Sequence, residues 1–176
     1  PAEIRELHAI FQGMDEHYHQ SPDKRATNRP LNIKTQLALW ICLGTACRIG
    51  ELLQARWEHV DLDTRTWFIP RANVKAKLQD QIVYLSDFTL SKFVALKTVT
   101  GDTEWLFPAK NKIGKTGHVS PKSISKQESD RQIKFKNRSK PLIGRTNDDS
   151  LVLSEGKNGE WTPHDLRRTA ATMMQE

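Results

Sequence analysis

Two short polar motifs, more than 100 residues apart, carry the side chains best suited to chemistry. One contains Arg48 and Glu51, and the other contains His164 and Arg167. In each motif the second residue follows the first at i+3, so in a helix both lie on one face about a turn apart. Arginine presents a planar fork of donors and stays charged, so two converging arginines form a clamp for a phosphodiester. The two motifs together predict a phosphate-binding site.

The composition favours a polyanionic partner for this chain. Its 176 residues carry a formal net charge of +6, and 37% of them are hydrophobic. This length predicts one domain, residues 1–176, with a buried core. The basic balance favours nucleic acid over a membrane. The longest apolar run, Leu37 to Leu43, is far too short to cross a bilayer, and Pro1 opens onto a charged amphipathic segment instead of a signal peptide. We therefore expect a cytoplasmic protein without a membrane partner.

Two further features concern the cysteines and the N-terminal residue. Cys42 and Cys47 fall in one predicted buried helix and point to different faces of it. We interpret them as small core residues in a reducing cytosol, and not as a disulfide or a metal site. Because the first residue is proline and not methionine, we interpret the chain as an excised fragment.

Hydrophobic periodicity predicts a mostly α domain with a small three-stranded antiparallel sheet. Apolar spacing and capping signals predict helices over residues 2–14, 33–47, 49–56, 86–99 and 120–132. Strands are expected over 57–62, 66–70 and 81–85, and the last two flank a loop rich in Lys and Gln, as in a hairpin with a long tip. A further short strand is expected at 151–153. Thr162, Pro163 and Asp165 satisfy the N-cap, N1 and N3 preferences of a last helix.

The positive charge is concentrated between Lys110 and Arg145. This stretch holds eleven Lys and Arg and two acidic residues, a local excess of +9, whereas the whole chain carries +6. We interpret it as part of a basic insertion at about 110–160. It is either a solvated, partly disordered loop or an arm whose cations contact DNA phosphates. The candidate DNA contacts are Lys122, Lys126, Arg131, Lys134 and Lys136.

The two motifs carry a family resemblance. The segment Arg48-Ile49-Gly50-Glu51-Leu52-Leu53, followed by Arg56-Trp57-Glu58-His59-Val60-Asp61, resembles the first arginine box of the tyrosine recombinases, and more narrowly of the phage and genomic-island integrases. Thr162-Pro163-His164-Asp165-Leu166-Arg167-Arg168-Thr169 resembles the second box, His-x-x-Arg. With a lysine-bearing hairpin between them, the resemblance covers about residues 33–176. It implies the helical catalytic domain of an integrase.

The resemblance also implies roles for individual residues. Arg48 and Arg167 would hold the non-bridging oxygens of the scissile phosphate and stabilise the charge of the transition state. Glu51 would support Arg48, and His164 would be a hydrogen-bonding and proton-transfer partner. Lys75 at the hairpin tip would be the general acid that protonates the leaving 5′ oxygen. Two of these residues have a structural alternative: Arg48 would only cap helical carbonyls, and His164, with Asp165, would only be a first-turn residue.

The hairpin lysines have two further interpretations. Lys77 is a rival to Lys75 as the general acid, because the alignment there is displaced by about one residue. In the second interpretation, each lysine only contacts the DNA backbone or lies in a solvated hairpin tip. Lys77 therefore also counts among the candidate DNA contacts.

The match departs from the family pattern at the nucleophile. The family's later histidine-or-tryptophan position and its tyrosine lie downstream of the His-x-x-Arg helix, and this sequence ends before either. Tyr18 and Tyr84 lie upstream and match neither position. The resemblance thus implies that the parent protein cleaves and rejoins double-stranded DNA at the attachment sites of a phage or another mobile element. It would act as a tetramer and without a cofactor, while this fragment is expected to be inactive.

Three alternative functions follow from the same residues, and the simplest is a helical domain whose basic stretch binds nucleic acid nonspecifically. A non-catalytic DNA-binding module of the same fold would also keep the phosphate-binding arginines. A hydrolytic nuclease built on the histidines would depend on a metal ion, whereas a recombinase would work in EDTA. We expect no metal site, because His17 and His19 at i, i+2 on a helix face opposite ways.

Overall fold

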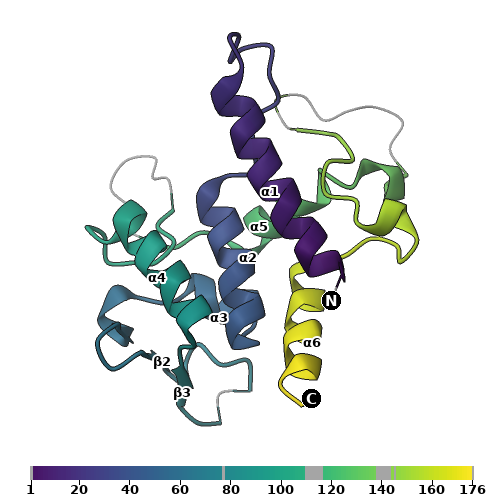
Figure 1. Ribbon diagram of the computed structural model, residues 1–176. Helices are drawn as coiled ribbons and strands as arrows, with labels where there is room; N and C mark the ends of the chain where they lie inside the picture. The colour runs from purple at the N-terminus through teal and green to yellow at the C-terminus, as the bar shows by residue number, and fades with distance from the viewer. Residues whose placement is uncertain (1, 77, 110–116, 138–143, 145, 176) are drawn as a thin grey trace. The chain divides into compact units, whose positions relative to one another are not determined.

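The computed structural model describes residues 2–76, 78–109, 117–137, 144 and 146–175 (Figure 1). It divides into two compact units. The larger unit consists of residues 34–123 and 163–176, and the smaller unit of residues 1–33 and 124–162. The helix α5 (Pro121–Ser129) begins in the larger unit and continues into the smaller one.

The larger unit is built around α2 (Ile33–Thr45), in which every residue from Thr35 to Leu43 is buried. This burial on all sides explains why the helix is apolar almost all round. The short α3 (Ile49–Leu53) follows it, then the 3₁₀ turn η1 (Trp57–His59) and α4 (Asp87–Thr100). The last helix of the unit is α6 (Pro163–Met173), which begins at the predicted N1 proline.

The sheet of the larger unit has the strand order β1 (Val60–Asp61), β2 (Thr66–Ile69) and β3 (Gln81–Tyr84), with both pairs antiparallel. Alternate residues of β2 face opposite sides, so Trp67 is fully buried and Phe68 is exposed. The Trp67 ring packs 5.9 Å from the ring of Phe93 on α4. The inner face of the sheet therefore packs against α4. That helix begins at the predicted N-cap, because the Ser86 hydroxyl accepts a hydrogen bond from the Thr89 amide.

The smaller unit contains α1 (Ala2–Gln20), most of α5, and two 3₁₀ turns, η2 (Ile133–Phe135) and η3 (Ser154–Gly156). Its core includes Leu7 and Phe11 of α1. The carboxylate of Glu6 accepts hydrogen bonds from the amide of Ser154, at 2.9 and 3.1 Å. This contact fastens α1 to the segment that follows the basic stretch.

The expected strand at 151–153 is wrong. Leu151 and Leu153 are buried, but Leu151 donates its amide to the carbonyl of Arg131 in an irregular segment that joins no strand. Burial thus explains the apolar run that resembled a strand.

The fold class is confirmed: helices predominate, and the sheet in the described residues is small, three-stranded and antiparallel. None of the helices in the described part of the chain combines the length and the apolar composition that a membrane crossing requires. The expected single domain with an insertion at about 110–160 stays a prediction.

Candidate active site

A pocket of about 380 Å³ in the larger unit brings the two sequence motifs together. Its wall includes every catalytic or supporting residue that the motifs predicted and that the structure describes: Arg48, Glu51, Lys75, His164 and Arg167. These residues come from α3 and its N-terminal flank, from the loop between β2 and β3, and from α6. The convergence of the two arginines, which sequence spacing alone does not determine, is therefore present in the fold.

Arg48 is oriented by Glu51. The carboxylate of Glu51 accepts one hydrogen bond from the main-chain amide of Arg48 and another from its Nη1 atom, each at 2.9 Å. The Glu51 side chain is 5% exposed, whereas that of Arg48 is 40% exposed. The buried carboxylate thus uses its hydrogen bonds to hold Arg48, and the Arg48 guanidinium still reaches the pocket. The alternative in which Arg48 caps the carbonyls of α2 finds no support among its described contacts.

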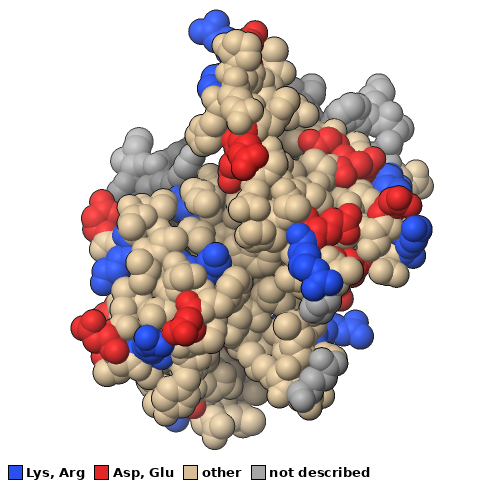
Figure 2. Space-filling model, viewed as in Figure 1, with Lys and Arg blue, Asp and Glu red and all other residues tan. Residues whose placement is uncertain are grey.

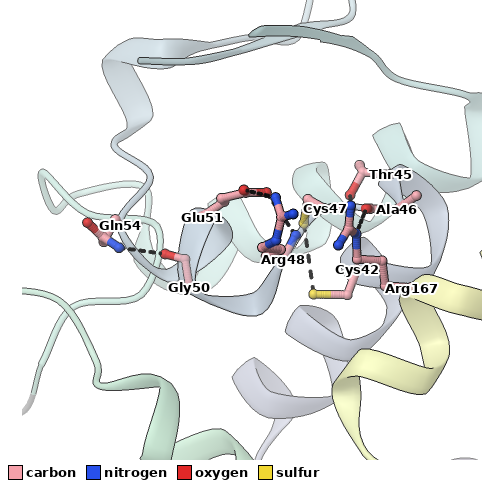
Figure 3. A network of polar contacts seen from close by, with 9 residues as sticks. All are labelled: Cys42, Thr45, Ala46, Cys47, Arg48, Gly50, Glu51, Gln54 and Arg167. Carbon is pink, nitrogen blue, oxygen red and sulfur yellow. Dashed lines mark hydrogen bonds and ion pairs between the residues drawn. The ribbon is translucent and has the colours of Figure 1, made fainter. Parts of the chain in front are cut away.

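Arg167 is oriented by the main chain at the end of α2. Its Nε atom donates a hydrogen bond to the carbonyl of Ala46 at 2.8 Å (Figure 3). Ala46 has a φ of +52°, a conformation that costs an alanine about 1 kcal/mol or more. The hydroxyl of Thr45 supports this turn by donating to the carbonyl of Ile41 and accepting from the amide of Cys47. A strained residue thus aims its carbonyl at a site arginine.

The same turn corrects the predicted geometry of the two cysteines. The helix was expected to continue to Cys47 and to place the cysteines on different faces. Instead α2 ends at Thr45, and the left-handed residue Ala46 redirects the chain. The sulfurs of Cys42 and Cys47 consequently lie 3.9 Å apart. Both thiols are free and buried.

Lys75 reaches the pocket from a loop that is fastened at its base. The side-chain amide of Asn73 donates to the carbonyl of Gln54, just after α3, at 3.2 Å. Val74 is buried, whereas Lys75 is exposed. The loop therefore anchors itself through Asn73 and Val74 and leaves the next side chain directed to the pocket. Lys77, the rival for the general-acid role, lies outside the described residues.

His164 lies in the first turn of α6, where helical amides have no intrahelical partner. Its side chain is exposed, while the preceding Pro163 is buried and fixes the helix start. His164 and Arg167, at i and i+3, both line the pocket. The first turn of a helix favours an anion, so this position suits a phosphate.

The electrostatics of the pocket favour a negatively charged ligand. Its wall carries Arg48, Lys75 and Arg167 as permanent cations against the single carboxylate of Glu51, a net charge of +2 with His164 neutral. On the face drawn in Figure 2, by contrast, basic and acidic side chains are interspersed over the region of α4. In the described residues, no three His, Cys, Asp or Glu side chains come together to hold a metal ion.

The predicted DNA-contacting cations are placed in different surroundings. Lys122 and Lys126 on α5 are exposed, as is Lys134, whose Nζ atom donates to the carbonyl of Glu155 at 2.9 Å. Lys136 is paired with the carboxylate of Glu160. These four lysines stay candidates for DNA contact.

Arg131 differs from those lysines. Its residue is 6% exposed, and its guanidinium donates to the carbonyls of Gln127 and Arg29. Burial also lowers the pKa of this arginine. Its hydrogen bonds hold the smaller unit together, so its burial argues against the predicted DNA contact.

Three residues of the pocket wall lie outside both boxes and were not predicted as site residues: Cys47, Gln54 and Asn73. The turn that contains Ala46 was missed because its segment reads as a continuous helix. Asn73 carries a weak signal, since asparagine is typical of loops, but its partner Gln54 is distant in the sequence. These contacts depend on packing and are invisible in local patterns.

Comparison with known proteins adds independent findings. The phage integrase family matches residues 14–176. The chain is 33% identical over 96 residues to prophage integrase IntA of Escherichia coli (strain K12), a match that covers 53% of this chain and 23% of that protein. It is 32% identical over 87 residues to the integrase of Enterobacteria phage P4, covering 43% of this chain and 20% of the relative. The chain thus spans about a fifth of the curated relatives that it matches.

Solved structures share the fold. The integrase of the transposon Tn1549 in complex with transposon right end DNA matches with a TM-score of 0.62 and 18% identity, over 99% of this chain and 51% of that one. XerA recombinase matches with a TM-score of 0.55 and 14% identity, over 95% of this chain and 47% of that one. At these identities the likeness concerns the fold alone.

Proposed function

Because this chain belongs to the phage integrase family, we propose that the complete protein is a tyrosine-type site-specific DNA recombinase. The observation that carries this proposal is the convergence of Arg48 and Arg167, with Lys75 and His164, on the wall of one cationic pocket. Its substrate is double-stranded DNA at attachment sites, and its place of action is the bacterial cytoplasm. On DNA the complete enzyme assembles as a tetramer.

The pocket supports a division of labour around one scissile phosphate. Arg48 and Arg167 bind the non-bridging oxygens and stabilise the charge that builds up in the transition state. Glu51 fixes the direction of the Arg48 guanidinium through its hydrogen bonds. His164 hydrogen-bonds a phosphate oxygen and moves a proton. Lys75 protonates the leaving 5′ oxygen, a role consistent with its exposed position on an anchored loop.

The chemistry is a phosphoryl transfer in two steps. A tyrosine hydroxyl attacks the phosphate and forms a 3′-phosphotyrosyl link, and a 5′ hydroxyl of the partner strand then reverses this link. Covalent catalysis divides one difficult displacement into two easier ones. The energy of the phosphodiester is conserved in the link, so the reaction requires neither ATP nor a metal ion.

The nucleophile is assigned to another part of the complete protein. Among the described residues that line the pocket there is no tyrosine. Tyr84 projects from β3 and is 79% exposed, and Tyr18 belongs to the smaller unit. We therefore expect residues 1–176 alone to bind DNA without cleaving it. Of the basic stretch, the described lysines Lys122, Lys126, Lys134 and Lys136 would contribute phosphate contacts.

A covalent-trapping assay tests the proposal. The complete protein is incubated with a nicked suicide substrate in EDTA, and the protein–DNA adduct is measured on a denaturing gel. We expect an adduct that Arg167→Ala reduces strongly. DNA binding without any adduct would instead support a non-catalytic binding module, and cleavage that disappears in EDTA would support a metal-dependent nuclease.

A further inference from the structure

The two cysteines lie next to the main-chain segment that orients both site arginines, so a reaction at their sulfurs would affect both. Cys42 lies on the buried helix α2, and Cys47 lies in the loop that leads to α3, with the two sulfurs 3.9 Å apart. Figure 3 shows these sulfurs facing each other close to the side chains of Arg48 and Arg167. Nothing in the recombination chemistry proposed above uses a thiol.

We propose that Cys42 and Cys47 form an oxidation site for a small peroxide, and that closing a disulfide between them disables the arginine pair. The thiol chemistry does not depend on the proposed function. Only the expected loss of DNA binding rests on it.

The surroundings of the two thiols give them different roles. Cys47 lines the pocket, which provides a route for a small oxidant, whereas Cys42 is fully buried. The hydrogen bond with Cys47 raises the pKa of Cys42 well above its usual value, and burial raises it further. Cys42 therefore keeps its proton while Cys47 is the thiol that the oxidant meets.

The reaction balances in two steps. The Cys47 thiolate attacks one oxygen of hydrogen peroxide, the O–O bond breaks, and the sulfur becomes a sulfenic acid while hydroxide leaves and takes up a proton. The Cys42 sulfur then attacks the Cys47 sulfur, the S–O bond breaks, and a second hydroxide leaves and is protonated by the proton from Cys42. The two sulfurs together lose two electrons, and peroxide becomes two water molecules.

Closing the disulfide requires the loop to move. The sulfurs must approach from 3.9 Å to about 2 Å. Cys42 belongs to a helix buried along most of its length, so the movement falls on the loop that carries Cys47. The neighbours of Cys47 in this loop are Ala46, whose carbonyl holds Arg167, and Arg48, whose amide is held by Glu51. Oxidation therefore shifts the main-chain points that orient both guanidinium groups.

The test uses the 176-residue chain treated with hydrogen peroxide. Free thiols are counted, tryptic peptides are mapped by mass spectrometry without reduction, and affinity for a short DNA duplex is measured before and after treatment. We expect a Cys42–Cys47 crosslink and a DNA affinity lower by roughly tenfold or more. Dithiothreitol should then remove the crosslink and restore the affinity. Thiols that stay free, or oxidation without a crosslink, would overturn the oxidation site.

Two controls separate the parts of the inference. Cys42→Ala removes the second sulfur, which lies outside the pocket wall, so peroxide should leave its DNA affinity unchanged within twofold. An equal loss of affinity in this variant would show that the disulfide is not what disables the arginines. If this variant does not fold, reversal of the crosslink in the unaltered chain still decides the question. A crosslink that leaves DNA affinity unchanged would refute the coupling to the arginines, whereas a chain that forms the crosslink but never binds DNA would refute the proposed function instead.

Discussion

The Nε atom of Arg167 donates a hydrogen bond to the main-chain carbonyl of Ala46 at 2.8 Å, across 121 positions of the sequence. The bond joins α6 to the loop that leads into Arg48, and Figure 1 shows α6 running beside the end of α2. Since the acceptor is a carbonyl and not a carboxylate, Arg167 is oriented without being neutralised. One turn of main chain thus sets the direction of one arginine and immediately precedes the other.

Replacing Arg167 with alanine in the complete enzyme should slow strand cleavage by a factor of about 10² to 10³, the usual cost of losing one preorganised donor to transition-state charge. Single-turnover formation of the covalent adduct measures this effect. The matched control is Arg168→Ala, because the Arg168 side chain is on the same helix but is 75% exposed. Equal losses in the two variants would show that only general positive charge matters.

Glu51→Gln should destabilise the chain by about 2 kcal/mol, because it replaces a buried charged acceptor with an amide whose NH2 group faces the Arg48 donors. Urea unfolding monitored by circular dichroism measures the free energy. Glu58→Gln is the control: this carboxylate is 65% exposed and lies 3.4 Å from Arg56, so its loss should cost under about 1 kcal/mol.

Ala46→Gly should stabilise the chain by roughly 0.5–1 kcal/mol. Glycine adopts a φ of +52° without the steric cost that alanine bears, and this gain exceeds the entropy lost on folding. The same substitution at Ala95, an exposed position within α4, should destabilise by about as much. Thermal melting compares the two variants, and a shift of the same sign in both would contradict the strain assigned to Ala46.

Asn73→Ala should slow cleavage by the complete enzyme, by about tenfold, because it frees the loop that presents Lys75 from the carbonyl of Gln54. The loss of cleavage rate should be smaller with a substrate whose leaving group needs no proton, such as a 5′-bridging phosphorothiolate, because that substrate does not require a general acid. Gln79→Ala, at an exposed position of the same loop, is the control. An unchanged cleavage rate for Asn73→Ala would contradict the role of Asn73 in positioning Lys75.

The stability contributed by Asp61 should depend on pH. Its carboxylate accepts hydrogen bonds from the amides of Thr64 and Asp63, and these bonds, Thr64 first, lower its pKa. A lowered folded-state pKa contributes stability above the unfolded value, near 3.9, which is lost as the pH falls through the folded value. Asp61→Ala should therefore melt below the unaltered chain at pH 7, and the difference should shrink below about pH 4. A difference that is constant with pH would contradict this linkage.

Local patterns predicted most of the secondary structure, because helix and strand periods, caps and breakers act over a few residues. The start of α4 at Ser86 and the start of α6 at Pro163 follow directly from capping preferences. The hairpin that carries Lys75 was likewise readable from two β-branched or aromatic runs around a polar loop. The strand predicted at residues 151–153 was wrong because an apolar run indicates burial, and a buried segment need not be a strand.

The sequence by itself determined the chemical types in the site: two arginines, a histidine, a lysine and a carboxylate, each at a recognisable spacing. Only the tertiary structure decided that Arg48 and Arg167 share a pocket, that Arg131 is buried among carbonyls, and that Cys47 faces Cys42. The physical reason is that these contacts join residues whose separation is set by packing and by one left-handed turn at Ala46. Neither leaves a periodic signal in the chain.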